Sequence, residues 1–447
     1  MPFAIGIGLM MVLVTITLLL KSQDNQVASI AQKQTSESLS LAEGGISRTL
    51  GNLNDNYQIF LQLNYDPNNL LGNSPDGPDE WSNPPNPPPC FNSLADIVSG
   101  KIPASASADT YTVEAYRYSD PDGVPENGDE TGTLLVKGHP LNSTAVTRIQ
   151  QTMEVARSDS PASFPGLMAQ QINLGNNDIL GAIAGNVVCT DAANCVVPTS
   201  ECADGKPTND GLRSAIGALN NGVVQGKIFI TEIDWPTVPT APTGTSGAAE
   251  VPTVSITGSS SFPRRDAMGT ITDTLVEGAY HYEVSSISLS GTDILTIDTT
   301  SAPVYFYLNG DLTMSGSAVI NHNCTGSSDG CGTYGSGLGS PERFRIYGLA
   351  DDGDSSADQS ITLNGGATAT NVFIYAPDAV MGINGGSSSP DINGAIWVRE
   401  WDGSSSNNAE ITVPNNMKQL LEDAGFVVTS PTLRTSAAIS WERKQAN

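Results

Sequence analysis

The chain has 447 residues, which exceeds a single average domain and leads us to expect two or three. It carries 47 acidic and 20 basic residues, and this acidic balance argues against nucleic-acid binding, which needs clustered lysines and arginines. The 45 glycines and 28 prolines, with many Ser, Thr, Asn and Asp residues, indicate β structure with frequent turns.

The first stretch of the chain has no charged residue from Pro2 to Leu20, and Lys21 ends this apolar run. A helix of that length rises about 28 Å, close to the hydrocarbon thickness of a bilayer. Apolar or small side chains then continue at steps of three, four and seven residues. The pattern predicts one long helix, residues 1–53, whose first half suits lipid and whose second half is amphipathic. The residues assigned to its apolar surface are Phe3, Ile7, Leu13, Val14, Leu20, Val27, Ala31, Ala42, Ile46 and Leu50.

Two simpler interpretations of this segment stay open. A secretory signal peptide would carry basic residues before the apolar run and small residues at a cleavage site, and neither is present. A plain membrane anchor would not need the amphipathic continuation. A filament subunit would need it, because the same helix has to leave the membrane and pack with copies of itself.

The run from Phe3 to Leu20, followed by Ala42-Glu43-Gly44-Gly45-Ile46, resembles the N-terminal helix of PilX-type minor pilins of the type IV pilus. The resemblance implies a globular head on the second half of the helix, storage in the inner membrane, and assembly with other pilin subunits into an extracellular filament at the cell surface. Pro2 and Ile7 depart from the family pattern, which has a glycine before the phenylalanine and a glutamate at the fifth mature position. Since Ile7 cannot pair with the terminal amine of a preceding subunit, the resemblance implies a place at the filament tip.

Residues 54–160 are interpreted as this head. Proline-rich segments between Asp76 and Cys90 cannot continue the helix. Runs of aromatic and β-branched residues at 111–118, 133–138 and 145–155 then predict an antiparallel β meander. A helix followed by a small antiparallel sheet agrees with the head that the resemblance implies.

An acidic loop in this head offers oxygen donors at Asp120, Asp122, Glu126 and Asp129. Carboxylates on a glycine-rich loop suit calcium, although their spacing does not match an EF-hand. The alternative is a solvated hairpin tip, and a second acidic loop at 351–358 has the same two interpretations. Calcium is the one cofactor that the sequence suggests.

Beyond Phe164 the chain consists of short apolar runs closed by turns, many of them Asn-Gly, that recur near every 20 residues between 289 and 383. This spacing predicts β-solenoid coils at 161–234 and 271–414, separated by a Pro, Thr and Ser-rich linker or insertion at 235–270. The alternative is a sandwich of Asn-Gly hairpins. Residues 415–447 are expected to form a short helix at 415–426, followed by a closing strand and a tail at 427–447.

The predicted fold class is therefore α+β and mainly β, with a long N-terminal pilin-like α-helix, a small antiparallel head and a large right-handed β-solenoid. The region from Tyr280 to Pro414 also resembles β-helical domains that are fused to PilX-like pilins. The resemblance implies that this domain is displayed by the filament.

The six cysteines are even in number and closely spaced, which favours disulfides outside the cytoplasm. Zinc is the alternative, but the sequence has no CxxC motif. We predict a local disulfide between Cys324 and Cys331. The pairing of the other four stays open: Cys90, Cys189, Cys195 and Cys202.

The sequence lacks a phosphate loop, a Gly-x-Ser-x-Gly motif and an H-E-x-x-H motif, and its three histidines are far apart. We therefore expect a structural subunit and not an enzyme, a minor or tip pilin that adheres to surfaces or glycans and does not bind nucleic acid. One alternative is the major subunit of a thick filament. Another is a surface-anchored carbohydrate-active enzyme. Its candidate catalytic acids are Asp293, Asp298, Asp311 and Asp391, and the simpler role for these four residues is to cap turns.

Overall fold

The structure is a computed structural model that describes residues 2–444 except 56, 72–78, 85–86, 92–93, 103–108, 122–129, 142, 159–164, 182–184, 204–205, 219–221, 231–234, 243–250, 325–339, 351–356, 386–390, 404–408, 415–416 and 418–431. The chain folds into two compact units. The first comprises Met1–Ser158 together with Thr432–Asn447, and the second comprises Asp159–Pro431. The second unit is thus an insertion within the sequence of the first.

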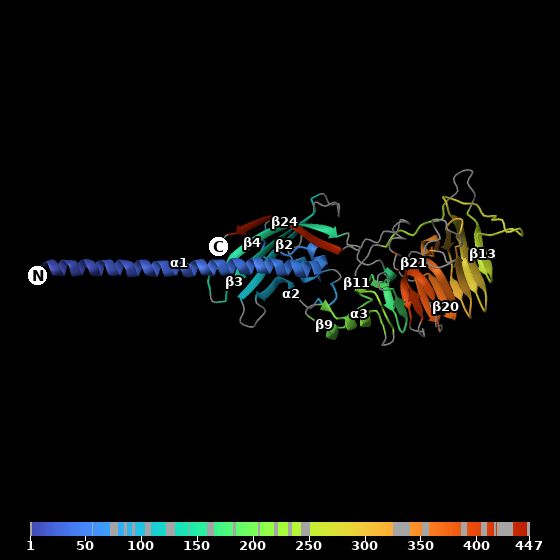
Figure 1. Cartoon of the computed structure of the whole chain (residues 1–447), viewed down its shortest axis with the longest axis horizontal. Helices are drawn as coiled ribbons and strands as arrows, with labels where there is room; N and C mark the ends of the chain where they lie inside the picture. The colour runs from blue at the N-terminus through green and yellow to red at the C-terminus, as the bar shows by residue number, and fades with distance from the viewer. Residues whose placement is uncertain are drawn as a thin grey trace. The chain divides into compact units, whose positions relative to one another are not determined.

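The first unit is organised around helix α1, which runs without interruption from Pro2 to Asp55 (Figure 1). The prediction of one long N-terminal helix is confirmed. Every side chain from Met10 to Lys33 is exposed, whereas Ala42 and Ile46 are buried. The second half of α1 therefore packs in the head, and the first half extends beyond it.

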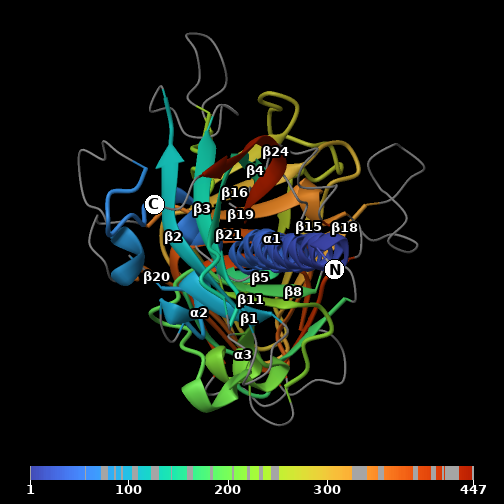
Figure 2. The same ribbon diagram turned by 90° about the vertical axis from the view of Figure 1, so that its left-hand side faces the viewer.

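The head is a five-stranded antiparallel sheet with the strand order β1-β2-β3-β4-β24. Apolar side chains from one face of this sheet, such as Val136 and Ile149, form a buried cluster with Ala42 and Ile46 of α1. Figure 2 shows α1 nearly end-on beside β2 and β3. The antiparallel meander expected here is observed, and the final strand of the chain is added to its edge. The strands are β1 (Ser99–Ile102), β2 (Asp109–Ser119), β3 (Thr131–His139), β4 (Thr147–Ser158) and β24 (Thr432–Lys444).

The segment between α1 and β1 closes one end of the head core. It contains the short helices η1 (Gln58–Gln62), η2 (Glu80–Ser82) and α2 (Ala95–Val98). The Trp81 side chain is fully buried, and its indole N–H donates to the carbonyl oxygen of Leu63 at 2.9 Å. A buried indole needs such an acceptor, so this hydrogen bond fixes the position of a loop that has little regular structure.

The second unit consists mainly of parallel strands that close into a single barrel. In Figure 1 these strands succeed one another from β13, in yellow, through β20 and β21, in orange, to β11, in green. Smaller elements are η3 (Thr199–Glu201), β9 (Cys202–Ala203), β10 (Lys206–Pro207), α3 (Asn209–Ala215) and η4 (Pro341–Arg343). The barrel strands are β5 (Pro165–Ala169), β6 (Gln171–Asn173), β7 (Asp178–Leu180), β8 (Asn186–Cys189), β11 (Ile228–Ile230), β12 (Thr253–Thr257), β13 (Ser260–Phe262), β14 (Tyr280–Leu289), β15 (Ile294–Asp298), β16 (Val304–Leu308), β17 (Leu312–Met314), β18 (Val319–Asn323), β19 (Phe344–Gly348), β20 (Gln359–Gly365), β21 (Thr368–Gly385), β22 (Ile392–Asp402) and β23 (Glu410–Thr412).

The prediction of a right-handed β-solenoid is wrong, because these strands close into one parallel barrel. Several Asn-Gly steps that the sequence assigns to turns lie within strands or at their ends. Asn364 and Gly365 end β20 and pair in register with Asn384 and Gly385 at the end of β21. A repeat of this length brings strands into lateral pairing, but it does not determine how the sheet closes. The alternative of Asn-Gly hairpins also fails here, since β20 and β21 are parallel.

The core of the barrel is a column of apolar side chains in register on neighbouring strands. Tyr282 of β14 pairs with Phe306 of β16, which pairs with Ile346 of β19 and, through it, with Ile374 of β21. All four side chains are buried. Parallel strands that are covered on both faces have nearly continuous apolar sequences, which explains runs such as that of β16.

Residues 415–426 were expected to form a short helix, and apart from Met417 they lie outside the described residues. The linker or insertion expected at 235–270 includes β12 and β13. Residues 427–447 are expected to form a closing strand and a tail, and residues 432–444 form strand β24 in the sheet of the first unit.

Candidate filament interface

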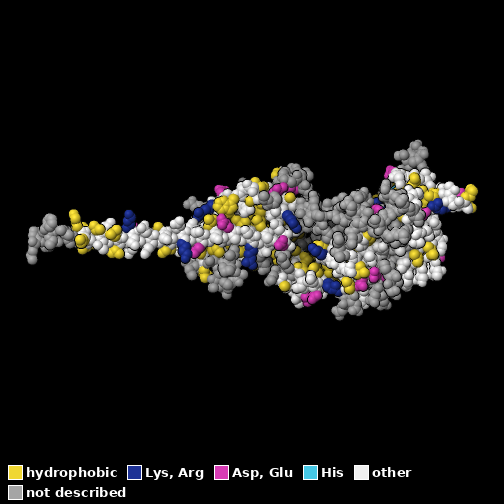
Figure 3. Space-filling view, in the orientation of Figure 1, with side chains coloured by type: hydrophobic (Ala, Val, Ile, Leu, Met, Phe, Trp, Pro, Cys, Tyr) yellow, Lys and Arg dark blue, Asp and Glu magenta, His cyan; other side chains and the backbone are white. Residues whose placement is uncertain are grey.

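The surface that could join this protein to other copies is the free half of α1. Its large apolar side chains are more than half exposed at many positions, with Leu13 at 56%, Val14 at 58% and Val27 at 66%. Figure 3 shows hydrophobic side chains along this part of the helix. Exposed apolar side chains that follow one another along an element mark an interaction surface. The others exposed on this part of the helix are Met10, Met11, Val12, Ile16, Leu18, Leu19, Leu20 and Ile30.

The two threonines in the apolar run do not make this surface polar. The hydroxyl of Thr15 donates to the carbonyl oxygen of Met11 at 2.7 Å, and that of Thr17 donates to the carbonyl oxygen of Leu13 at 2.8 Å. Each hydroxyl is thus satisfied within the helix and needs neither water nor a partner. The run can therefore be buried against another apolar surface without leaving a side-chain donor unpaired.

The residues assigned to one apolar stripe have two different environments. Ala42 and Ile46 are buried in the head, and Leu50 is half-buried. Ala31 is exposed, as are the stripe residues that precede it down to Leu13. Of the two remaining residues of the stripe, Phe3 and Ile7, the structure places the backbone in α1, but their side chains lie outside the described residues.

Within the part of the chain that the structure describes, no helix combines the length and the apolar character needed to cross a membrane.

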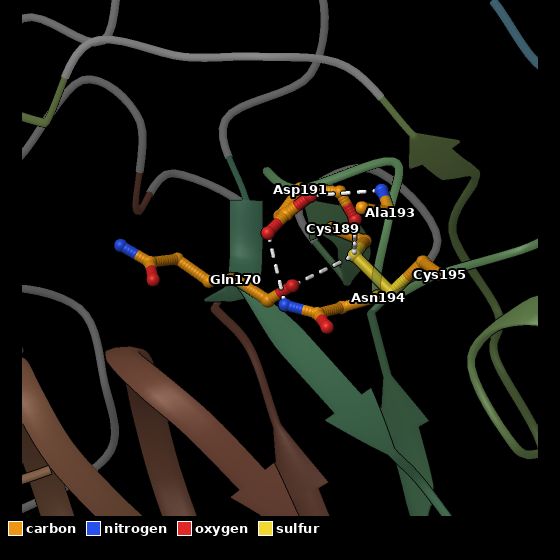
Figure 4. The surroundings of a disulfide bond; sticks show 6 residues. All are labelled: Gln170, Cys189, Asp191, Ala193, Asn194 and Cys195. Carbon is orange, nitrogen blue, oxygen red and sulfur yellow. Dashed lines mark hydrogen bonds between the residues drawn. A yellow bond between two sulfur atoms is a disulfide. The ribbon is translucent and has the colours of Figure 1, made fainter. Parts of the chain in front are cut away.

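One disulfide is defined in full and links Cys189 to Cys195 (Figure 4). The Asp191 carboxylate holds the intervening loop, because it accepts from the backbone N–H of Ala193 at 2.8 Å and from the amide of Asn194 at 2.9 Å. Both cysteines are buried. Disulfides are typical of proteins outside the cytoplasm, which agrees with an extracellular or surface-exposed chain.

Each of the remaining described cysteines, Cys90, Cys202 and Cys324, is also disulfide-bonded. Cys331 lies outside the described residues, so its predicted bond to Cys324 stays a prediction. We expect peptide mapping under non-reducing conditions to recover one peptide pair that contains Cys324 and Cys331. Two free thiols at these positions, or either cysteine bonded elsewhere, would show that the predicted pair does not exist.

The candidate calcium loop falls almost wholly outside the described residues. Asp120 lies just after β2, whereas Asp122, Glu126 and Asp129 are not described, and neither are residues 351–356 of the second acidic loop. Among the described residues, no group of three or more His, Cys, Asp and Glu side chains is placed to hold a metal ion. Calcium binding by these loops therefore stays a prediction.

The four acids considered for an enzyme each accept a backbone N–H at a turn or strand end. Asp293 accepts from Ser290, Asp298 from Thr300, Asp311 from Ser360 and Asp391 from Glu410, at 2.8 to 3.0 Å. These contacts support the turn-capping interpretation. Burial raises the pKa of Asp391, and the nearby Glu410 carboxylate adds to this effect.

The two histidines of the barrel are also held by structural contacts. Both ring nitrogens of His322 are engaged, Nε2 with the hydroxyl of Thr299 and Nδ1 with the carbonyl oxygen of Asn371, each at 2.7 Å. Burial lowers the pKa of His322 to about 4, so this ring is neutral near pH 7. The Nδ1 atom of His281 lies 3.0 Å from the hydroxyl of Tyr307, and burial lowers the pKa of His281 as well.

The sequence interpretation missed one cavity in the head, which lies on the sheet face turned away from α1. Its charged lining comes from Arg117 of β2, Arg148 of β4 and Lys444 of β24. The alternation of polar and apolar residues in β4 places Arg148 and Gln150 on one face of the sheet, and this signal could have been used. The contribution of Lys444 could not have been found, because nothing local pairs β24 with β4.

Comparisons with known proteins give limited information. A family model described as a domain of unknown function, DUF7305, matches residues 255–420, which lie in the second unit. No curated protein matches the chain. Among solved structures, the chain is similar to the competence-associated pilin ComZ from Thermus thermophilus, with 11% sequence identity and coverage of 92% of this chain and 97% of that chain. The TM-score of that superposition is 0.21, which is too low to carry an argument about fold or function.

Proposed function

We propose that the protein is a structural subunit of a pilin-like extracellular filament. In this proposal the free half of α1 packs with the helices of other subunits, and the barrel of the second unit is displayed. The observation that carries the proposal is the set of exposed large apolar side chains of α1 between Met10 and Leu20, on a helix whose second half is fixed in a folded head.

The physical argument is the cost of this surface in water. Burying apolar area contributes about 25 cal/mol per Å², so each large side chain of the run contributes roughly 1.5–3 kcal/mol when it packs against another copy. Helices that pack side by side are the simplest way to cover such a long and narrow surface. The same helix then joins the subunit to the filament and supports its head.

The proposal also places the protein in the filament as a minor subunit or as the subunit at the tip. Counted from Phe3 as the first mature residue, Ile7 stands where the pilin pattern has a glutamate, and in this proposal the subunit lacks the carboxylate that would pair with a neighbouring terminal amine. A large displayed unit at the tip does not crowd the shaft, and its Ser, Thr, Asn and Asp side chains suit hydroxyl-rich surfaces or glycans. Storage in the inner membrane before assembly belongs to the same proposal.

The helix contact can be tested with Leu13→Asp. An unpaired charge buried between helices costs about 3–5 kcal/mol, so we expect at least about a hundredfold less protein in sheared filaments than for the unchanged chain. Ser22→Asp is the matched control, because Ser22 is exposed on the same helix between Lys21 and Asp24. Incorporation of Leu13→Asp at the level of this control would reject the proposed role of α1.

Position in the filament needs a separate measurement. Gold label directed at the barrel should appear at one end of purified filaments if the subunit is at the tip. Label along the shaft at each repeat would instead make the protein the major subunit of a thick filament.

A further inference from the structure

The head contains a cavity of about 500 Å³ on the sheet face opposite α1. On this face Arg117 is paired with Thr133, and Arg148 is paired with Lys444 across the β4–β24 ladder. Leu70 and Leu71 belong to the segment that precedes β1, and they line the same cavity. A volume of this size suits a ligand of small-molecule dimensions.

The charged lining of this cavity is basic, although the whole chain has a net charge of −27. Arg148 is bound to Glu114, with Nε 2.5 Å from Oε2 and Nη2 3.1 Å from Oε1, so its charge is largely balanced. Lys444 lies 2.8 Å from the Glu442 carboxylate, but the Lys444 side chain is 41% exposed and the Glu442 side chain 63%. An ion pair this exposed contributes little and is easily exchanged for another anion.

Arg117 adds a more specific feature. Its Nη1 atom donates to the carbonyl oxygen of Leu71 at 3.1 Å, which fixes the guanidinium group. Its Nη2 atom is buried and has no hydrogen-bond partner among the residues that the structure describes. A buried cationic donor without a partner is costly, and a carboxylate bound at this guanidinium group would remove that cost through a charge-assisted hydrogen bond.

The cavity also offers an apolar surface. Leu135 lies on the same face of β3 as Thr133 and is buried, while Leu70 remains 43% exposed. Together with Leu71 these side chains form an apolar lining beside the cationic groups. We propose that the cavity binds a small organic carboxylate, with the carboxylate at Arg117 and Lys444 and the aliphatic part against the three leucines.

Hexanoate and its neutral isostere hexanamide test this site in the full-length protein. With leucine methyl groups isotopically labelled, we expect hexanoate to shift the NMR signals of Leu70, Leu71 and Leu135 saturably. Hexanamide should bind at least about fivefold more weakly, because it cannot form the charge-assisted hydrogen bonds. Raising the salt concentration should weaken hexanoate binding and leave hexanamide unaffected.

Three variants complete the test. Arg117→Gln and Lys444→Gln should each weaken hexanoate binding about fivefold or more and leave hexanamide binding unchanged. Lys227→Gln, an exposed site in the second unit, should change neither. Lys444 is exposed on an edge strand, so its variant remains informative even if Arg117→Gln does not fold. Equal affinity for the two probes, no saturable shift with hexanoate, or an unaltered Lys444→Gln variant would each overturn the proposal.

Discussion

A chain in which residues 159–431 are replaced by Asn-Gly should still fold into a complete head on α1. Ser158 of β4 and Thr432 of β24 are direct partners in the antiparallel ladder, so their backbones already lie where a two-residue hairpin turn would join them. Asn-Gly is the turn that this geometry favours. The pairing of β4 with β24 then becomes a local contact, and every strand of the head sheet is retained.

The expected result is a chain with the helix and antiparallel sheet intact. Hydrogen exchange should show protected amides in α1 beyond Ser38 and in β24, as in the full-length protein. A matched control deletes residues 159–447, which removes β24 as well and should expose the β4 edge and cause aggregation. If the Asn-Gly variant lacks protection in β24, the head does not fold independently of the inserted unit.

The same deletion separates assembly from display. If α1 alone carries the filament contact, the shortened chain should enter filaments as efficiently as the full-length chain. It should then lack any adhesion that depends on the barrel. Failure to assemble, in a variant shown to be folded, would place part of the filament contact in the second unit and would contradict the proposed division of roles.

The part of the fold that the sequence predicts is the part determined by local patterns. The apolar run and the stripe of steps of three and four specify α1, because residues at these spacings share one face of a helix. The strands of the meander follow from their alternation and aromatic content. Both depend on residues close together in sequence, and both are found.

The boundary between the buried and the exposed half of α1 was not predictable in this way. The stripe continues from Val27 to Leu50 without a change in pattern, yet Val27 is exposed and Ile46 is buried. What differs is the presence of the sheet: the Ser38 hydroxyl lies 2.6 Å from that of Thr147 in β4, near the point where burial begins. That contact joins residues more than a hundred positions apart, and no local pattern encodes it.

Long-range pairing also explains the error in the second unit. The spacing near 20 residues predicts solenoid coils, but strand register does not determine whether a sheet coils or closes. Ile396 of β22 pairs with Leu167 of β5, so the last strands return to the first across the whole unit. This closure, and the recruitment of β24 to the head, depend on contacts between distant segments that the sequence does not show.

Gly138→Ala should weaken the packing of α1 on the head sheet. Gly138 lies in β3 where the helix crosses it, and a Cβ atom there would overlap the carbonyl oxygen of Ser38 and lie 2.6 Å from the backbone nitrogen of Ala42. These are backbone atoms of a packed helix, so no side-chain rotation can relieve the overlap. Overpacking of this kind costs about 1–3 kcal/mol, and the added methyl group recovers little of it.

The measurement is hydrogen exchange of the α1 amides between Ser38 and Leu53, which should become faster by roughly five- to a hundredfold for that range of free energy. Gly51→Ala is the matched control, because Gly51 is exposed on the same helix and a Cβ atom there meets nothing within 4 Å. Alanine favours a helix over glycine by about 0.8–1.0 kcal/mol, so exchange in this control should slow. Faster exchange in Gly138→Ala together with slower exchange in Gly51→Ala would identify the close approach of the α1 and β3 backbones at Gly138 as the cause. Equal effects would mean that α1 does not depend on Gly138 for its contact with the sheet.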